Sequence, residues 1–85
     1  MKSDLEGLAA REAANHPVYY GGQDNPYEAI KVIEAWNLNF SLGNALKYIC
    51  RAGKKDADTL IGDLEKARQY LDFEIERRAR EQEGR

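Results

Sequence analysis

The sequence has few of the residues that usually reinforce a small domain. Among 85 residues there is one cysteine, Cys50, and one histidine, His16. A single cysteine excludes an intramolecular disulfide, and one residue of each kind excludes a zinc site built from cysteine and histidine ligands. We therefore expect the chain to use no metal and no other cofactor.

Long hydrophobic runs are also missing. No window approaches the roughly 18 apolar residues of a membrane-spanning helix. The N-terminal residues are acidic and amphipathic and lack the apolar core of an export signal. A lone cysteine agrees with a reducing compartment. We therefore expect a cytoplasmic protein that does not enter a membrane.

Neither sign of charge dominates. Thirteen Lys and Arg residues against fifteen Asp and Glu residues give a net charge of −2, which argues against general nucleic-acid binding. A chain of this length forms one domain and buries only roughly 60% of the surface that it exposes when unfolded. With no disulfide or metal to help, we expect a homo-oligomer.

What is present is helical periodicity. It predicts an all-α fold, a small bundle of three main helices plus an N-terminal helix. The amphipathic N-terminal helix takes residues 1–14, where Ser3 and Glu6 form a capping box. A helical domain follows over 15–80, with a charged tail over 81–85. An irregular Gly-rich loop, HPVYYGG, joins the first two helices.

The second helix is expected to begin at Pro26, with Asn25 as its N-cap and Glu28 completing the cap. Its apolar residues, which include Tyr27 and Trp36, cover a wide arc. That pattern favours a buried helix.

Two more helices follow. The third is expected to run from an N-cap at Ser41 to Ala52, with Gly53 as a left-handed C-cap. The fourth is expected to begin at 58–59 and to run to about Glu81. Apolar residues at helical spacing predict its core stripe: Leu60, Ile61, Leu64, Ala67, Leu71 and Ile75.

The fourth helix carries a second stripe about 100° or more from the first: Asp63, Lys66, Tyr70, Phe73 and Arg77. Tyr70 and Phe73 are large and apolar for a solvent-exposed face. We interpret Tyr70, Phe73 and Arg77 as an oligomer interface. The alternative is that this face packs under the N-terminal helix of the same chain.

The third helix divides into two faces. Leu42, Ala45, Leu46 and Ile49 follow the spacing of a core face. The opposite side carries an amide, an ammonium, a phenol ring and a guanidinium in one row: Asn44, Lys47, Tyr48 and Arg51. Arginine binds phosphate with two parallel hydrogen bonds, lysine acts as a point charge, and tyrosine offers a stacking surface.

Positive charge is concentrated around this row. Between Glu34 and Asp56 there is no acidic residue, and four basic residues lie there: Lys47, Arg51, Lys54 and Lys55. This combination suits a phosphorylated aromatic ligand. The alternative is a solvated face with salt bridges to acids of the fourth helix, of which Asp63, Glu65 and Asp72 are the candidates.

The loop HPVYYGG is a second candidate region. Its glycines allow close approach of backbone to a ligand, and Tyr19 or Tyr20 could stack on a base. The alternative is that His16 is a hydrogen-bonded structural residue and that one tyrosine belongs to the core. The phosphate-binding P-loop, HExxH, GxSxG and EF-hand motifs are all absent.

Three segments resemble a family of small bacteriophage proteins, the SaV-like family, a domain of unknown function often labelled nucleotide kinase. The segments are HPVYYGG, EAIKVIEAWNLNFSLGNALKYICRAGKK and DLEKARQYLDFEI, and they extend from His16 to about Ile75. Tyr19 stands where the family usually has a second histidine. The resemblance implies a phage-encoded protein of the host cytoplasm that is connected with nucleotides.

The resemblance selects the same row of the third helix and adds positions from the loop and the fourth helix. The candidate ligand-binding residues are then His16, Tyr19, Tyr20, Asn44, Lys47, Tyr48, Arg51, Lys54, Asp63 and Lys66. Three functions remain open: an oligomeric protein that binds and sequesters a nucleotide, a nucleoside monophosphate kinase that uses Mg²⁺, or an adaptor that binds a host protein through Tyr70 and Phe73.

Overall fold

The computed structural model describes residues 15–84, so the expected N-terminal helix lies outside the described part of the chain. The elements in order are a 3₁₀ turn η1 (Val18–Tyr20), helices α2 (Ala29–Ala35) and α3 (Phe40–Arg51), a 3₁₀ turn η2 (Ala57–Thr59) and helix α4 (Leu60–Glu83). Residues 15–84 contain no strand. The expected all-α fold is confirmed.

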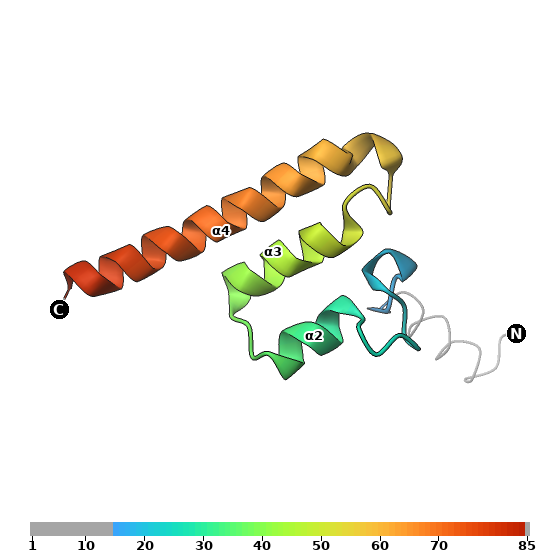
Figure 1. Cartoon of the computed structure of the whole chain (residues 1–85), viewed down its shortest axis with the longest axis horizontal. Coiled ribbons are helices and arrows are strands. Elements are labelled where there is room, and N and C mark those ends of the chain that lie inside the picture. The colour runs from blue at the N-terminus through green and yellow to red at the C-terminus, as the bar shows by residue number, and fades with distance from the viewer. Residues whose placement is uncertain (1–14, 85) are drawn as a thin grey trace, which may run out of the picture.

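Helix α3 is the centre of the arrangement (Figure 1). Helix α2 and η1 lie along one side of it, and α4 runs antiparallel along the other. With 24 residues against 12, α4 is about 36 Å long and α3 about 18 Å. The C-terminal half of α4 therefore extends beyond the N-terminus of α3, because the two helices are antiparallel (Figure 1).

The expected start of α2 is wrong. The helix begins at Ala29, not at Pro26, and its N-cap position is held by Glu28. The side chain of Asn25 instead accepts a hydrogen bond from the backbone N–H of Tyr27 at 2.8 Å, which forms a turn before the helix. Tyr27 consequently lies outside the helix and is 79% exposed.

The expected N-cap of α3 is also wrong. Asn39, not Ser41, is the N-cap, and its side-chain oxygen accepts a hydrogen bond from the backbone N–H of Leu42 at 3.0 Å. The end of α3 is as expected to within a residue. Gly53 follows with a φ of +72°, the left-handed conformation that glycine adopts at little cost.

Large hydrophobic residues do not form the buried core. Within residues 15–84 the buried hydrophobic residues are Ala29, Ala45 and Ala67. The expected core stripe of α4 is wrong apart from Ala67, because its Leu and Ile residues are 41–65% exposed. Helix α2 is not buried as expected either: Ile30 and Trp36 are both exposed.

The reason is the orientation of α4. Its buried residues are Asp63, Ala67 and Glu74, a line about 80° to one side of Leu64 on the helix. Alanine at the contact lets the α3 and α4 backbones approach closely. Each buried methyl(ene) contributes only about 0.8 kcal/mol. Polar contacts must therefore contribute to the packing of α4 on α3.

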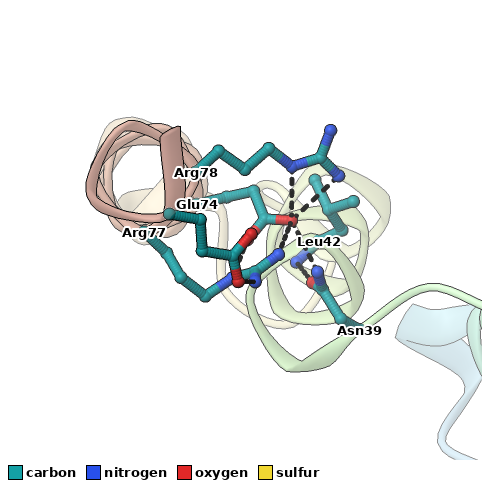
Figure 2. A network of polar contacts seen from close by, with 6 residues as sticks. Asn39, Leu42, Glu74, Arg77 and Arg78 are labelled. Carbon is teal, nitrogen blue, oxygen red and sulfur yellow. Dashed lines mark hydrogen bonds and ion pairs between the residues drawn. The ribbon is translucent and has the colours of Figure 1, made fainter. Parts of the chain in front are cut away.

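Glu74 supplies one set of these contacts (Figure 2). Its carboxylate accepts hydrogen bonds from Asn39 of α3, at 2.5 Å, and from Arg77 and Arg78 of its own helix, at 2.8 and 3.1 Å. The bonds from Arg77 and Asn39 outweigh burial and lower the pKa of Glu74 to about 2. The carboxylate thus ties the N-terminus of α3 to the middle of α4.

Candidate functional site

Three tyrosine rings and four cationic side chains gather where η1, the C-terminal half of α3 and the start of α4 meet. We call this set the aromatic–basic cluster, and its members are Tyr19, Tyr20, Lys47, Tyr48, Arg51, Lys55 and Lys66. The turn η1 is fixed by a bond from the N–H of Tyr20 to the carbonyl of Pro17. The thiol of Cys50 in α3 points to the carbonyl of Tyr19 at 3.8 Å.

Arg51 lies at the centre of the cluster. Its Nη1 donates a hydrogen bond to the Tyr20 hydroxyl at 3.3 Å. Its guanidinium carbon lies 5.6 Å from the ring centre of Tyr19 and 5.1 Å from that of Tyr48. These distances are typical of cation–π contacts. One side chain of α3 therefore sets the positions of all three rings.

Asp63, in the first turn of α4, forms an ion pair with Arg51. Its Oδ1 is 3.3 Å from Nε of Arg51, and its Oδ2 accepts bonds from the hydroxyl of Thr59 and the N–H of Gly53. Asp63 is only 2% exposed. The bond to Tyr20 raises the pKa of Arg51, burial opposes this, and the nearby charge of Asp63 adds to the increase. The guanidinium is therefore already engaged within the chain, by a hydrogen bond from Nη1 and an ion pair at Nε.

The three lysines are placed differently. Their Nζ atoms lie 5.3–5.4 Å from ring centres, with Lys47 over Tyr20, Lys55 over Tyr19 and Lys66 over Tyr48. None of the three pairs with a carboxylate of residues 15–84. A cation–π contact leaves the ammonium N–H groups free to bind an anion. The lysines, rather than Arg51, are therefore the groups best placed to hold phosphate.

A small cavity of about 180 Å³ adjoins the cluster and shares Tyr20 and Lys47 with it. The remaining lining residues are Asn15, Glu28, Ala29, Ile30 and Ile33. Drug-sized pockets have roughly 300–1,000 Å³, so this cavity suits a fragment such as a base or a sugar. Its combination of an aromatic ring, aliphatic side chains and one carboxylate is typical of a site for a flat polar ring.

The carboxylate of this cavity belongs to Glu28, which is 1% exposed. His16 Nδ1 lies 2.7 Å from its Oε2, and Lys31 Nζ lies 3.3 Å from its Oε1. Burial tends to raise the pKa of Glu28, but the contacts with His16 and Lys31 outweigh it and the pKa is lowered. His16 is therefore engaged with a carboxylate at the edge of the site.

The structure separates the remaining predicted site residues. The side chain of Asn44 donates to the carbonyl of Phe40 in its own helix at 2.8 Å, so it lies away from the cluster. Lys54 is exposed and does not lie over a tyrosine ring within the described residues. Asp63 and Lys66 do join the cluster, one beneath Arg51 and one over Tyr48.

The residues predicted to form an oligomer interface make contacts within the chain. The ring of Tyr70 stacks on that of Tyr48 at 5.9 Å and meets Phe40 and Phe73 edge-on. Arg77 bonds to Glu74 and Glu81. The prediction that they also meet a second chain stays a prediction.

Sequence reasoning left two contributors out of its list of site residues. Lys55 lies in the acid-free basic stretch, which was the available signal. The position of Glu28 in the sequence predicts a helix-capping role, and nothing there indicates that its carboxylate turns inward to His16. Within residues 15–84, no three His, Cys, Asp or Glu side chains come close enough to hold a metal ion.

Comparison with known proteins identifies one family. Residues 14–72 match the family described as protein of unknown function (DUF3310), a span that covers the loop, all of α2 and α3, and the first half of α4. No curated protein and no solved structure matches the chain. Among the described residues, no helix is both long and apolar enough to cross a membrane.

Proposed function

The chain belongs to the DUF3310 family, and since that description assigns no activity, we propose from the site itself that it binds a nucleotide. The observation that supports this most directly is the set of three lysine ammonium groups, each 5.3–5.4 Å from a tyrosine ring. Few ligands need both positive charge and aromatic surface within one small site. A phosphorylated base does.

The two parts of the site divide the ligand between them. The cavity beside Tyr20 takes the base, which lies between the phenol ring and the aliphatic wall that includes Ile33. Lys47 stands at the junction and binds the first phosphate, and Lys55 and Lys66 attract further phosphates. Stacking on an aromatic ring contributes roughly 1–3 kcal/mol per base and tolerates any base.

The biological setting belongs to the same proposal. We infer that the protein is a SaV-like phage protein that works as an oligomer in the host cytoplasm. It sequesters a nucleotide or a nucleotide-derived signal without transforming it. The absence of a P-loop from the sequence supports binding over phosphoryl transfer. Turnover of a monophosphate with ATP and Mg²⁺ would instead identify a kinase.

Isothermal titration against mono-, di- and cyclic nucleotides tests the proposal. We expect at least one of them to bind, and the double variant Lys47→Ala, Lys55→Ala to bind it about 100-fold more weakly, because each hydrogen bond to a charged group contributes about 1.5–3 kcal/mol.

The matched control is Lys54→Ala, compared with the single variant Lys55→Ala. Each removes one positive charge from the same stretch of chain, but Lys54 does not touch a ring of the cluster. Equal losses of affinity in these two single variants would mean that only net charge matters. Failure of every nucleotide to bind would overturn the proposal.

A further inference from the structure

The α3–α4 pair carries an apolar surface on the side away from Tyr48 and Tyr70. We call it the α3–α4 apolar face, and it consists of Leu42, Ile49, Ile61, Leu64, Leu71 and Ile75. All except the half-buried Leu42 are 41–65% exposed. Leu42 of α3 and Leu71 and Ile75 of α4 line one shallow groove, so the surface is continuous across both helices.

This face has an arrangement that fits a copy of itself. Ile61, Leu64, Leu71 and Ile75 follow the alternating three- and four-residue steps of a coiled-coil seam, with Arg68 at the central seam position. Ile61 and Ile75 each lie seven residues from Arg68. An antiparallel pair of α4 helices with its two-fold axis near Arg68 therefore places isoleucine against isoleucine at both ends.

The charges beside the seam agree with this pairing. Arg68 has Glu65 three residues before it and Asp72 four residues after it, on the flank of the seam. Near the axis, two arginines would meet four carboxylates, so each guanidinium has opposite charges on its own helix and on its partner. A seam that is apolar at its ends and charge-balanced at its middle is self-complementary.

The size of the surface also fits. At about 100 Å² of apolar area per fully exposed Leu or Ile side chain, the five half-exposed residues offer on the order of 300 Å². A standard interface takes about 800 Å² per partner, with a mixed polar rim around the apolar centre. The length of α4, including the half that α3 does not accompany (Figure 1), supplies such a rim.

We propose that two copies of the chain associate through the α3–α4 apolar face, with their α4 helices antiparallel. This names a surface for the oligomer that we infer above, and it differs from the one expected around Tyr70 and Phe73. The proposal does not depend on nucleotide binding. Residues 1–14 offer fewer and smaller apolar side chains than a second α4 does, with Leu5 and Leu8 the largest beside Met1.

Sedimentation equilibrium of the full-length chain tests the proposal, with two matched variants. Leu71→Gln and Phe73→Gln change residues of nearly equal exposure, 41% and 44%, on different sides of α4. We expect a dimer for the unmodified chain, a dissociation constant raised more than tenfold by Leu71→Gln, and little change for Phe73→Gln. Far-UV circular dichroism checks that each variant is folded.

A third variant covers the case in which Leu71→Gln does not fold. Arg68→Glu keeps the exposed position polar but puts six carboxylates at the axis, so it should also weaken the dimer more than tenfold. A chain that stays monomeric up to 100 µM overturns the proposal, because the face is then covered by residues 1–14 or meets a different protein. If Phe73→Gln dissociates the dimer and Leu71→Gln does not, the proposal is overturned in favour of an interface around Tyr70 and Phe73.

Discussion

The two faces of the α3–α4 pair differ in where their side chains find partners. On the aromatic–basic side, Arg51 is shared by Asp63, Tyr20, Tyr19 and Tyr48, and the rings support the lysines. On the apolar side, Leu and Ile residues remain about half exposed. The first face is organised before any ligand arrives, whereas the second is left for another apolar surface to complete.

The comparison shows why the same two helices can serve two purposes. A preorganised polar site spends little free energy on ordering side chains when a ligand binds. An apolar face needs no such organisation, because the hydrophobic effect is non-directional and follows the area removed from water. Glu74 lies at the boundary, since it lines both the groove with Leu71 and the groove with Phe40.

The largest expected effect comes from Asp63→Ala, which breaks the polar face alone. It leaves the guanidinium of Arg51, 16% exposed, without its carboxylate. Breaking a buried ion pair costs roughly 3–5 kcal/mol, and we expect about 3 kcal/mol here because the arginine reaches some water. Urea unfolding measures the loss.

Glu76→Ala is the control for this change. It removes an exposed carboxylate from the same helix, and we expect a loss below about 0.5 kcal/mol. Similar losses for the two variants would contradict the view that Asp63 organises the cluster.

A change of pH tests the boundary between the faces. The pKa of Glu74 is about 2 in the folded chain, against an ordinary 4.5. A depressed carboxylate pKa stabilises the fold above pH 4.5, and that stabilisation is lost as the pH falls from 4.5 towards 2. We expect the urea midpoint to fall over this window, with Glu28 contributing in the same direction.

The variant Glu74→Gln isolates the contribution of Glu74. It should be less stable than the unmodified chain at pH 7, and the difference should shrink as the pH approaches 2. A difference that stays constant with pH would show that the interaction with Arg77 and Arg78 does not depend on the charge of Glu74.

The smallest expected effect separates the faces without any mutation. Raising the salt concentration from 50 to 500 mM screens the lysines, so nucleotide affinity should fall several-fold. Association through the apolar face should weaken less, since salt screens the charges around Arg68 but not the hydrophobic contacts. Titration and sedimentation under the same two conditions measure both. Parallel weakening of the two would mean that one of the faces has been assigned the wrong chemistry.

Much of the fold could be predicted from the sequence, because helical spacing and the glycine at Gly53 are local signals. The predicted starts of α2 and α3 are wrong because two capping residues lie close together at each of them. Asn39, not Ser41, caps α3, and its amide also donates to Glu74, 35 residues away. A tertiary contact of this kind leaves no local trace.

The site was predictable in part for the same reason. Lys47, Tyr48 and Arg51 share a helix face, so their proximity follows from spacing. Their meeting with Tyr19 and Tyr20 depends on how η1 folds back on α3. The loop HPVYYGG makes the two tyrosines candidates, but nothing in it places them beside α3. The prediction that the apolar stripe of α4 is buried is wrong, because periodicity identifies an apolar face but not the element that covers it.

Asn39 makes the junction of α3 and α4 unusually selective for one amino acid (Figure 2). Its oxygen accepts from Leu42 while its nitrogen donates to Glu74. Aspartate would keep the cap but oppose two negative charges, serine would cap without reaching Glu74, and glutamine is too long to cap. Asn39 and Glu74 therefore constrain each other, because a substitution at either position alone breaks the hydrogen bond between them.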